Sequence, residues 1–116
     1  MSAAARGWSF QVLGPLLVSH SGEQIVIGRP RQRAVLGYLL LNAGQLVSTE
    51  RLIDAVWGER PPATARAQVQ ADIASIRKAL APQGTDRLAT VPAGYRFAAD
   101  ADELDRRALT LSRQPA

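Results

Sequence analysis

Cysteine is absent from the 116-residue sequence, and histidine occurs once, as His20. The missing thiols exclude disulfides and thiolate metal sites, and a single histidine cannot form a dyad or a metal site with a second one. The longest apolar run, residues 35–41, contains Gly37 and is far too short to span a bilayer. Residues 1–7 lack the apolar region of a signal peptide. We therefore expect a cytoplasmic protein that uses no membrane, no metal and no cofactor.

Apolar content and basic charge are what the chain does contain. With 47% hydrophobic and 21% charged residues, it has enough apolar material for the core of one domain. Residues 1–99 hold eleven basic and six acidic side chains, a net charge of +5, whereas the tail from Asp100 carries −1. This distribution favours a polyanionic partner, with solubility alone as the alternative. Arginine is strongly preferred over lysine and alanine is abundant, which is typical of a high-GC bacterial genome.

Three short β-rich runs at the start of the chain predict a small antiparallel sheet. They cover residues 8–13, 15–18 and 25–27 and are separated by the turn residues Gly14-Pro15 and Ser21-Gly22. Runs of this length between turn residues are typical of short antiparallel strands. We therefore expect a three-stranded antiparallel sheet before the first helix.

Two helices are expected next. Pro30 suits the first position of a helix and Gly44 its C-terminal end. Ser48 is a favourable N-cap for a second helix, which Gly58 would end. The expected apolar faces are Val35, Leu36, Leu39 and Leu40 in the first helix, and Leu52, Ile53, Val56 and Trp57 in the second.

A third helix and a hairpin complete the prediction. The helix is expected within residues 62–80, and its apolar positions fall within about 60° of one another at roughly 100° per residue. A hairpin is expected over residues 87–97, where Gly94 would supply a positive φ at the turn. The order indicates an α+β winged helix-turn-helix, with an N-terminal three-stranded antiparallel sheet, three helices and a C-terminal β-hairpin wing. The apolar positions of the third helix are Val69, Ile73, Ile76 and Leu80.

Five ordered blocks of the sequence match a known family. They are Phe10 to Leu16, Pro30 to Leu36, Val47 to Gly58, Arg77 to Leu80, and Gly94 to Phe97. On these blocks the chain resembles the DNA-binding domain of the Streptomyces antibiotic regulatory protein family, a branch of the OmpR/PhoB-type winged helices. The resemblance covers residues 8–99, and we expect residues 1–7 to be disordered and residues 100–116 to be a tail that begins a helical activation domain.

The resemblance implies a function and its partners. It implies a transcription activator, not an enzyme, that binds direct repeats in double-stranded DNA upstream of an antibiotic or other secondary-metabolite biosynthetic cluster. Two copies would lie side by side on DNA, and the chain would be a monomer in solution. The loop between the second and third helices would contact RNA polymerase through its sigma factor. In this sequence the loop residues are Glu59, Arg60, Pro61 and Pro62.

The candidate DNA contacts lie on all three helices and on the hairpin. Glutamine can pair with adenine, an acidic side chain can accept from the amino group of cytosine, and basic side chains or helix N-termini can bind phosphate. In OmpR/PhoB relatives the exposed side of the third helix enters the major groove. The candidates are Gln68, Gln70, Asp72, Ser75, Arg77 and Lys78 on the third helix, Arg87 and Arg96 on the hairpin, and Arg31, Arg33, Thr49 and Trp57 on the first two helices.

Two features leave an alternative function open. Ala74 and Ser75 occupy positions that are often basic or hydrogen-bonding in the family, so the third helix carries fewer arginines than its relatives. Its small, nearly neutral surface would also suit a protein-contact module with reduced or lost DNA binding. Trp57 is expected to be mainly a core residue, with its indole N–H as a further phosphate donor. No nucleotide-binding loop or nucleophile–base pair is visible in the sequence, so no enzyme is predicted.

Overall fold

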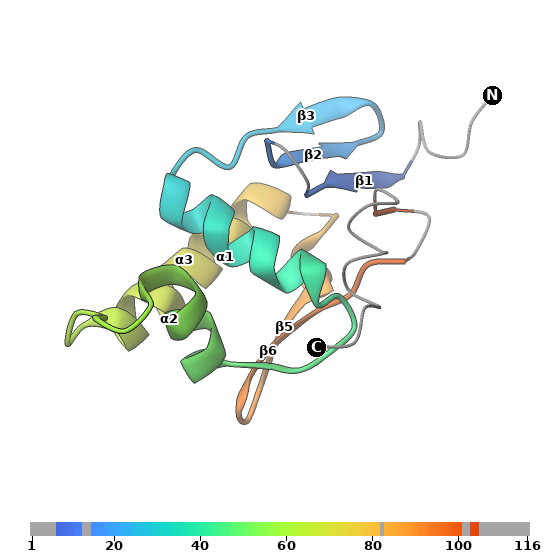
Figure 1. The fold of residues 1–116 in the computed structure, drawn as a ribbon. Helices are drawn as coiled ribbons and strands as arrows, with labels where there is room; N and C mark the ends of the chain where they lie inside the picture. Colours follow the sequence, from blue (N-terminus) through green and yellow to red (C-terminus); the bar gives the residue numbers. More distant parts are fainter. Residues whose placement is uncertain (1–6, 13–14, 82, 101–102, 105–116) are drawn as a thin grey trace.

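The computed structural model describes residues 7–12, 15–81, 83–100 and 103–104. Figure 1 shows the N-terminal strands on one side of the three helices and a second hairpin extending away from them. The elements are β1 (Trp8–Gln11), β2 (Leu17–His20), β3 (Glu23–Ile25), α1 (Pro30–Leu41), β4 (Val47–Ser48), α2 (Thr49–Trp57), α3 (Ala65–Leu80), β5 (Leu88–Val91) and β6 (Gly94–Phe97). This order agrees with the predicted one, except that a two-residue strand, β4, lies between the first two helices and a short 3-10 helix, η2 (Thr85–Arg87), precedes the second hairpin.

The N-terminal sheet is antiparallel with the order β1-β2-β3, as predicted. The third strand begins at Glu23, earlier than the predicted start at Ile25. The reason is the tight turn before it, where Ser21 and Gly22 have φ values of 53° and 84°. Two consecutive positive φ values form a two-residue hairpin turn, which lets the following residue pair at once with β2.

Local signals account for the start of α1 and for both ends of α2, whereas α1 ends at Leu41 with Asn42 as its C-cap, before the predicted stop at Gly44. Pro30 occupies the first turn of α1, and the predicted apolar face of this helix is buried. The Ser48 Oγ accepts a hydrogen bond from the backbone N–H of Arg51 at 3.1 Å, which confirms the predicted N-cap of α2. Gly58 ends α2 with a φ of 67°. These caps satisfy backbone groups that the helix itself leaves unpaired.

α3 is the longest helix among the described residues. It begins at Ala65, later than the predicted start, because residues 58–64 form the connection from α2. Its apolar side packs against α1 and α2 and buries Val69, Ile73, Ile76 and Leu80, as the periodicity predicts. None of the helices among the described residues is long and apolar enough to cross a membrane.

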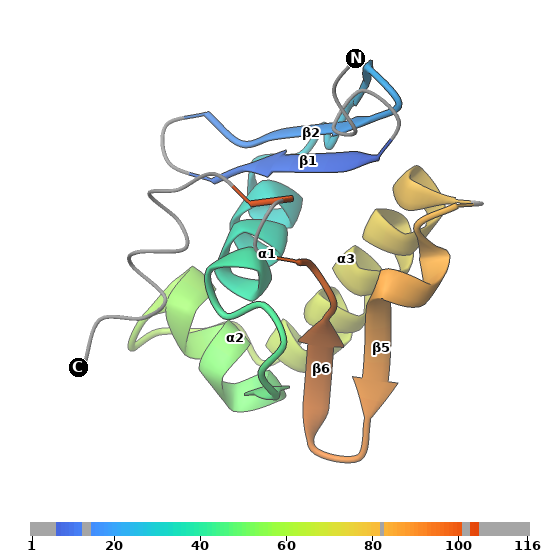
Figure 2. The same ribbon diagram turned by 90° about the vertical axis from the view of Figure 1, so that its right-hand side faces the viewer.

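The second sheet has the order β4-β6-β5, and we call the β5–β6 hairpin the wing. Figure 2 shows the wing beside α3 and pointing away from the N-terminal sheet. Gly94 does not have the positive φ that was predicted for it, so that prediction was wrong. Glycine is needed here for space, because a Cβ at this position would lie 2.1 Å from the carbonyl oxygen of Val47.

The packed unit extends beyond the predicted boundary at residue 99. Leu104 is 9% exposed and bridges to Phe10 of β1, and the Phe10 N–H donates to the Glu103 carbonyl oxygen at 2.7 Å. The segment after the wing therefore returns to the N-terminal sheet. Residues 1–6 of the segment predicted to be disordered, and residues 101–102 and 105–116 of the predicted tail, lie outside the described residues, whereas the Gly7 carbonyl oxygen accepts a hydrogen bond from the Ser21 N–H at 3.0 Å.

Candidate nucleic-acid interface

Small and polar side chains form the outer surface of α3. Residues three and four positions apart share one side of a helix, and one such series is exposed along α3 from its first turn to its last. The opposite side is buried against α1 and α2. We call the exposed series the α3 ridge. It consists of Ala67, Gln70, Ala71, Ala74, Ser75 and Lys78.

The two glutamines predicted to read bases have different surroundings. Gln68 is half-buried, and its Nε2 donates to Thr64 Oγ1 at 2.8 Å across the first turn of α3. Gln70 is exposed on the α3 ridge. An exposed amide offers both its donor and its acceptor to an adenine edge. Of the two, Gln70 has the geometry that base reading requires.

Asp72 does not lie on the exposed side of α3, which corrects its proposed contact with cytosine. Its side chain is 2% exposed, and its two carboxylate oxygens accept hydrogen bonds from Arg31 Nε at 2.6 Å and Arg31 Nη2 at 3.0 Å. The hydrogen bond to Asp72 raises the pKa of Arg31 above its ordinary value. Because a buried carboxylate needs a partner, Asp72 is a structural link between α3 and α1.

Arg31 and Trp57 lie where α1 meets α2. The Arg31 guanidinium lies over the Trp57 ring, 5.8 Å from the ring centroid. The indole packs against the hydrophobic core but remains partly exposed, as does the Arg31 side chain at 35%. Trp57 therefore packs against the edge of the core and is not itself among the buried residues, and both side chains keep some surface through which a phosphate could be reached.

Arg33 and Thr49 are engaged in local structure. The Arg33 Nη1 donates to the carbonyl oxygens of Ile27 and Gly28, at 3.0 and 2.8 Å, and so fixes the connection from β3 to α1. Thr49, in the first turn of α2, is 7% exposed. These positions make Arg33 and Thr49 weaker candidates for phosphate binding than residues on the ridge or on the wing.

Arg77 ties α3 to the wing. Its Nε donates to the Leu88 carbonyl oxygen at 2.9 Å, and its Nη2 donates to Thr90 Oγ1. A guanidinium has five N–H donors, so Arg77 can hold the wing and still offer donors to a phosphate. Lys78, the next residue, is exposed at the end of the α3 ridge.

The wing itself carries little charge near its tip. Pro92 and Ala93 form the connection between β5 and β6, and both are exposed. Arg96 is exposed on β6 between the buried residues Tyr95 and Phe97. Since successive side chains of a strand point to opposite faces, Arg96 faces away from the core, where it can reach a nucleic acid beside α3.

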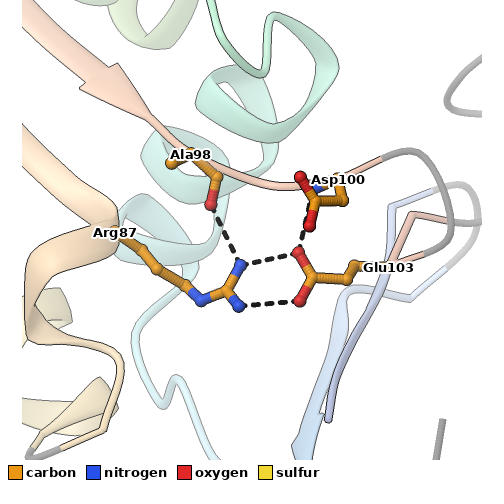
Figure 3. Close-up of polar contacts among 4 residues, drawn as sticks. All are labelled: Arg87, Ala98, Asp100 and Glu103. Carbon is orange, nitrogen blue, oxygen red and sulfur yellow. Dashed lines mark hydrogen bonds and ion pairs between the residues drawn. The ribbon is translucent and has the colours of Figure 1, made fainter. Parts of the chain in front are cut away.

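Arg87 lies at the base of the wing, and contacts within the domain engage its guanidinium, which makes it a weaker candidate for the predicted DNA contact. Figure 3 shows its guanidinium paired with both oxygens of Glu103, each at 2.7 Å, while Nη1 also donates to the Ala98 carbonyl oxygen at 3.1 Å. The guanidinium also lies 5.4 Å from the ring centroid of Trp8. Because these contacts surround Arg87, it connects the wing to the N-terminal sheet.

Glu103 completes this link, although no sequence signal singled it out. Burial of Glu103 raises its pKa, while hydrogen bonds from the Arg87 guanidinium and from the Asp100 backbone N–H lower it. The net result is a pKa below the ordinary value of a glutamate. Glu103 is therefore ionised at neutral pH, as the paired geometry in Figure 3 requires.

A third ion pair, which the sequence pattern likewise did not predict, joins the two helices of the helix-turn-helix. Arg66, in the first turn of α3, donates from Nη2 to Glu50 Oε2 in the first turn of α2. Both side chains are largely exposed. Sixteen positions separate the two residues, so no local spacing rule could reveal the contact.

The connection between α2 and α3 is available to a protein partner. Every residue from 58 to 64 is exposed. The four predicted polymerase-contact residues lie in this segment, and the two consecutive prolines restrict its backbone because their φ values are fixed. These residues are Glu59, Arg60, Pro61 and Pro62.

Comparison with known sequences identifies regulatory relatives. A model of the family described as "Transcriptional regulatory protein, C terminal" matches residues 22–97. The transcriptional regulatory protein MoaR1 of Mycobacterium tuberculosis is 42% identical over 91 residues, which cover 76% of this chain and 29% of MoaR1. The regulatory protein AfsR of Streptomyces coelicolor is 45% identical over 73 residues, which cover 63% of this chain and 7% of AfsR. The chain thus spans less than a third of either relative.

Solved structures share the fold. EmbR of Mycobacterium tuberculosis, solved in complex with a low-affinity phosphopeptide, has a TM-score of 0.76 at 35% identity, covering 84% of this chain and 26% of EmbR. The DNA-binding domain of Klebsiella pneumoniae RstA, solved in complex with the RstA box, has a TM-score of 0.61 at 26% identity, covering 78% of this chain and 94% of that domain.

Proposed function

Because this chain belongs to the family described as "Transcriptional regulatory protein, C terminal", we propose that it is the sequence-reading unit of a transcription activator. It is an OmpR/PhoB-type winged helix, and its relatives are regulators of the Streptomyces antibiotic regulatory protein type. Its fold is that of domains that bind double-stranded DNA. The observation that carries the proposal is the α3 ridge, an exposed helix side next to a β-hairpin on a basic domain.

In this proposal α3 enters the major groove along its ridge. The groove of B-DNA is about 12 Å wide and admits one α-helix. The alanines of the ridge let the helix approach the base edges closely, and Gln70 pairs with an adenine. Lys78, Arg77 and Arg96 bind phosphates at the end of α3 and along the wing. Phosphate contacts of this kind supply affinity, and base contacts supply sequence preference.

The operator in this proposal is a direct repeat. α3 has 16 residues and is therefore about 24 Å long, so one ridge reads only a few base pairs. Two monomers side by side on tandem half-sites would supply the remaining selectivity. The resemblance to the antibiotic regulatory proteins supports a site upstream of a secondary-metabolite cluster, within the nucleoid.

RNA polymerase is the protein partner in this proposal. The loop from Glu59 to Pro62 is exposed and lies between α2 and α3, so it projects from the helix-turn-helix without belonging to the α3 ridge. We infer that this loop contacts the sigma factor while α3 occupies DNA. Its stiffness favours recognition of a protein surface, since little conformational entropy is lost when it binds.

Selection of bound duplexes from a random DNA pool tests the proposal. We expect enrichment of direct repeats at low salt and a steep loss of affinity as salt rises, because each phosphate contact releases counterions. Gln70→Ala should then relax the preference at one or two base pairs, by about 1–3 kcal/mol. Gln68→Ala is the matched control, since its amide is held by Thr64, and it should leave base preference unchanged.

Two other outcomes would contradict the proposal. A steep salt dependence without enrichment would mean general phosphate attraction with no sequence reading. Absence of binding even at low salt would favour the protein-contact module, for which the small side chains of the α3 ridge would provide a close-packing surface.

A further inference from the structure

An exposed ion pair connects the first turns of α2 and α3. The Arg66 and Glu50 side chains are 58% and 70% exposed, with their charged groups in hydrogen-bonding contact. Ion pairs this exposed contribute little to folding stability because water and salt screen both charges. An acceptor with a denser negative charge can therefore displace the carboxylate without destabilising the domain.

Arg66 shares a flank of α3 with Gln70 and Arg77. At about 100° per residue, the three positions fall within about 40° of one another. Eleven residues separate the two arginines, which corresponds to about 16 Å along the helix axis. Arg77 is directed toward the wing by Leu88 and Thr90, and Arg66 toward α2 by its carboxylate partner. The exposed amide of Gln70 thus lies between two cations.

We propose that Arg66 is a phosphate contact of this domain, and that Glu50 holds its guanidinium in the free protein until a DNA phosphate replaces the carboxylate. This inference rests on the proposed function, in which α3 reads DNA. Guanidinium binds phosphate and carboxylate oxygens with the same paired donors, so the exchange needs no change of fold. DNA presents about one charge per 1.7 Å of helix axis, whereas Glu50 presents a single charge.

Glu50 opposes DNA binding in two ways. It occupies Arg66, and it places a negative charge at the first turn of α2, beside the start of α3. Its pKa lies below the ordinary value because its own backbone N–H donates to it and because Arg66 does so as well. The carboxylate is therefore charged at neutral pH, and its removal should strengthen binding.

Affinity measurements on the 116-residue chain with the selected operator test the exchange. Glu50→Gln should bind about three- to ten-fold more tightly at low salt, because it frees Arg66 and removes a nearby negative charge. Arg66→Gln should bind about three- to ten-fold more weakly, and its slope of log affinity against log salt should be shallower by about one. In the double variant, most of the gain from Glu50→Gln should be lost, and only the effect of removing one negative charge, less than about two-fold, should remain.

Asp54→Asn is the matched control. Asp54 is exposed on α2 one turn after Glu50, and within the described part of the chain it forms no ion pair. Its substitution removes the same charge without releasing Arg66, so affinity should change less than about two-fold. Circular dichroism and thermal unfolding should show that every variant has the fold of the unsubstituted chain.

The outcomes separate this inference from the proposed function. If Arg66→Gln keeps full affinity and slope while Gln70→Ala still relaxes base preference, the phosphate contact is wrong and the proposed function stands. A double variant that keeps the gain of Glu50→Gln would overturn the exchange, because Glu50 would then act by repulsion alone. If the unsubstituted chain binds no duplex, both proposals fail.

Discussion

Arg31 and Asp72 form an ion pair in which the two side chains are unequally buried, and this difference determines how much the loss of each side chain lowers the stability of the fold. The Asp72 side chain is 2% exposed, whereas that of Arg31 is 35% exposed. If Asp72 is removed, Arg31 can turn into water. If Arg31 is removed, the carboxylate is left buried without a partner, which is costly in a protein interior. This ion pair explains why Asp72, which was predicted to contact a cytosine, has a structural role instead.

At the residue scale we therefore expect unequal effects on stability. Arg31→Met should lower the free energy of unfolding by about 3–5 kcal/mol, and Asp72→Leu by only about 1–2 kcal/mol, because the remaining guanidinium regains water. The double variant should recover much of the loss, since an apolar pair of similar volume can replace a buried ion pair. Urea unfolding of the three variants measures these differences. A larger loss for Asp72→Leu than for Arg31→Met would contradict this explanation.

At the scale of elements, the wing depends on a close approach between β6 and β4. Gly94 pairs with Ser48, and a Cβ on Gly94 would meet the Val47 carbonyl oxygen at 2.1 Å and the Ser48 Cα at 2.7 Å. Both neighbours are backbone atoms, so neither can move without separating the strands. Because Ser48 also caps α2, displacement of β4 would disturb the start of the helix-turn-helix.

Gly94→Ala should therefore destabilise the chain by about 3 kcal/mol, near the upper end of typical overpacking costs. Gly37→Ala is the control with the opposite expected sign. Gly37 lies inside α1, and a Cβ there would meet no described atom within 4 Å outside its own helix backbone, so alanine should stabilise the helix by about 0.5–1 kcal/mol. Chemical unfolding measures both effects. A Gly94→Ala variant as stable as the unsubstituted chain would show that the strands can separate at little cost.

A feature of these elements could be predicted when the residues that determine it are close together in the sequence, and not when they are far apart. Ser48 and Gly58 act on backbone groups a few residues away, so the sequence predicted both ends of α2. Gly94 was assigned the wrong role because its neighbour, Val47, is far away in sequence. The burial of Asp72 depends likewise on Arg31, which lies 41 positions earlier. Helical periodicity identified the apolar side of α3, but it could not decide which flanking polar residues are exposed.

At the scale of the whole molecule, the contacts of Arg87 and Glu103 join the N-terminal sheet, the wing and the segment after the wing. Arg87 lies at the base of the wing, and its guanidinium contacts the Trp8 ring and pairs with the Glu103 carboxylate. The backbone carbonyl oxygen of Glu103 accepts a hydrogen bond from the Phe10 N–H. Neither the family resemblance nor the composition indicated this arrangement, because it brings together residues from both ends of the chain. It fixes the position of Glu103 relative to β1.

The Arg87–Glu103 pair should make the stability of the domain depend on pH. The pKa of Glu103 is lowered in the folded protein, so its contribution is complete above the ordinary glutamate pKa and is lost as the pH falls through the lower, folded value. Glu103→Gln should cost about 1–3 kcal/mol near pH 7, since it weakens a charge-assisted pair whose side chains are 14% and 23% exposed. Below about pH 4.5 the difference in stability from the unsubstituted chain should shrink.

Thermal unfolding from pH 7 to pH 3 measures this difference. Glu23→Gln is the control, because Glu23 is an exposed residue of β3. A difference that stays constant over this range would mean that Glu103 stabilises the fold through packing and not through its charge.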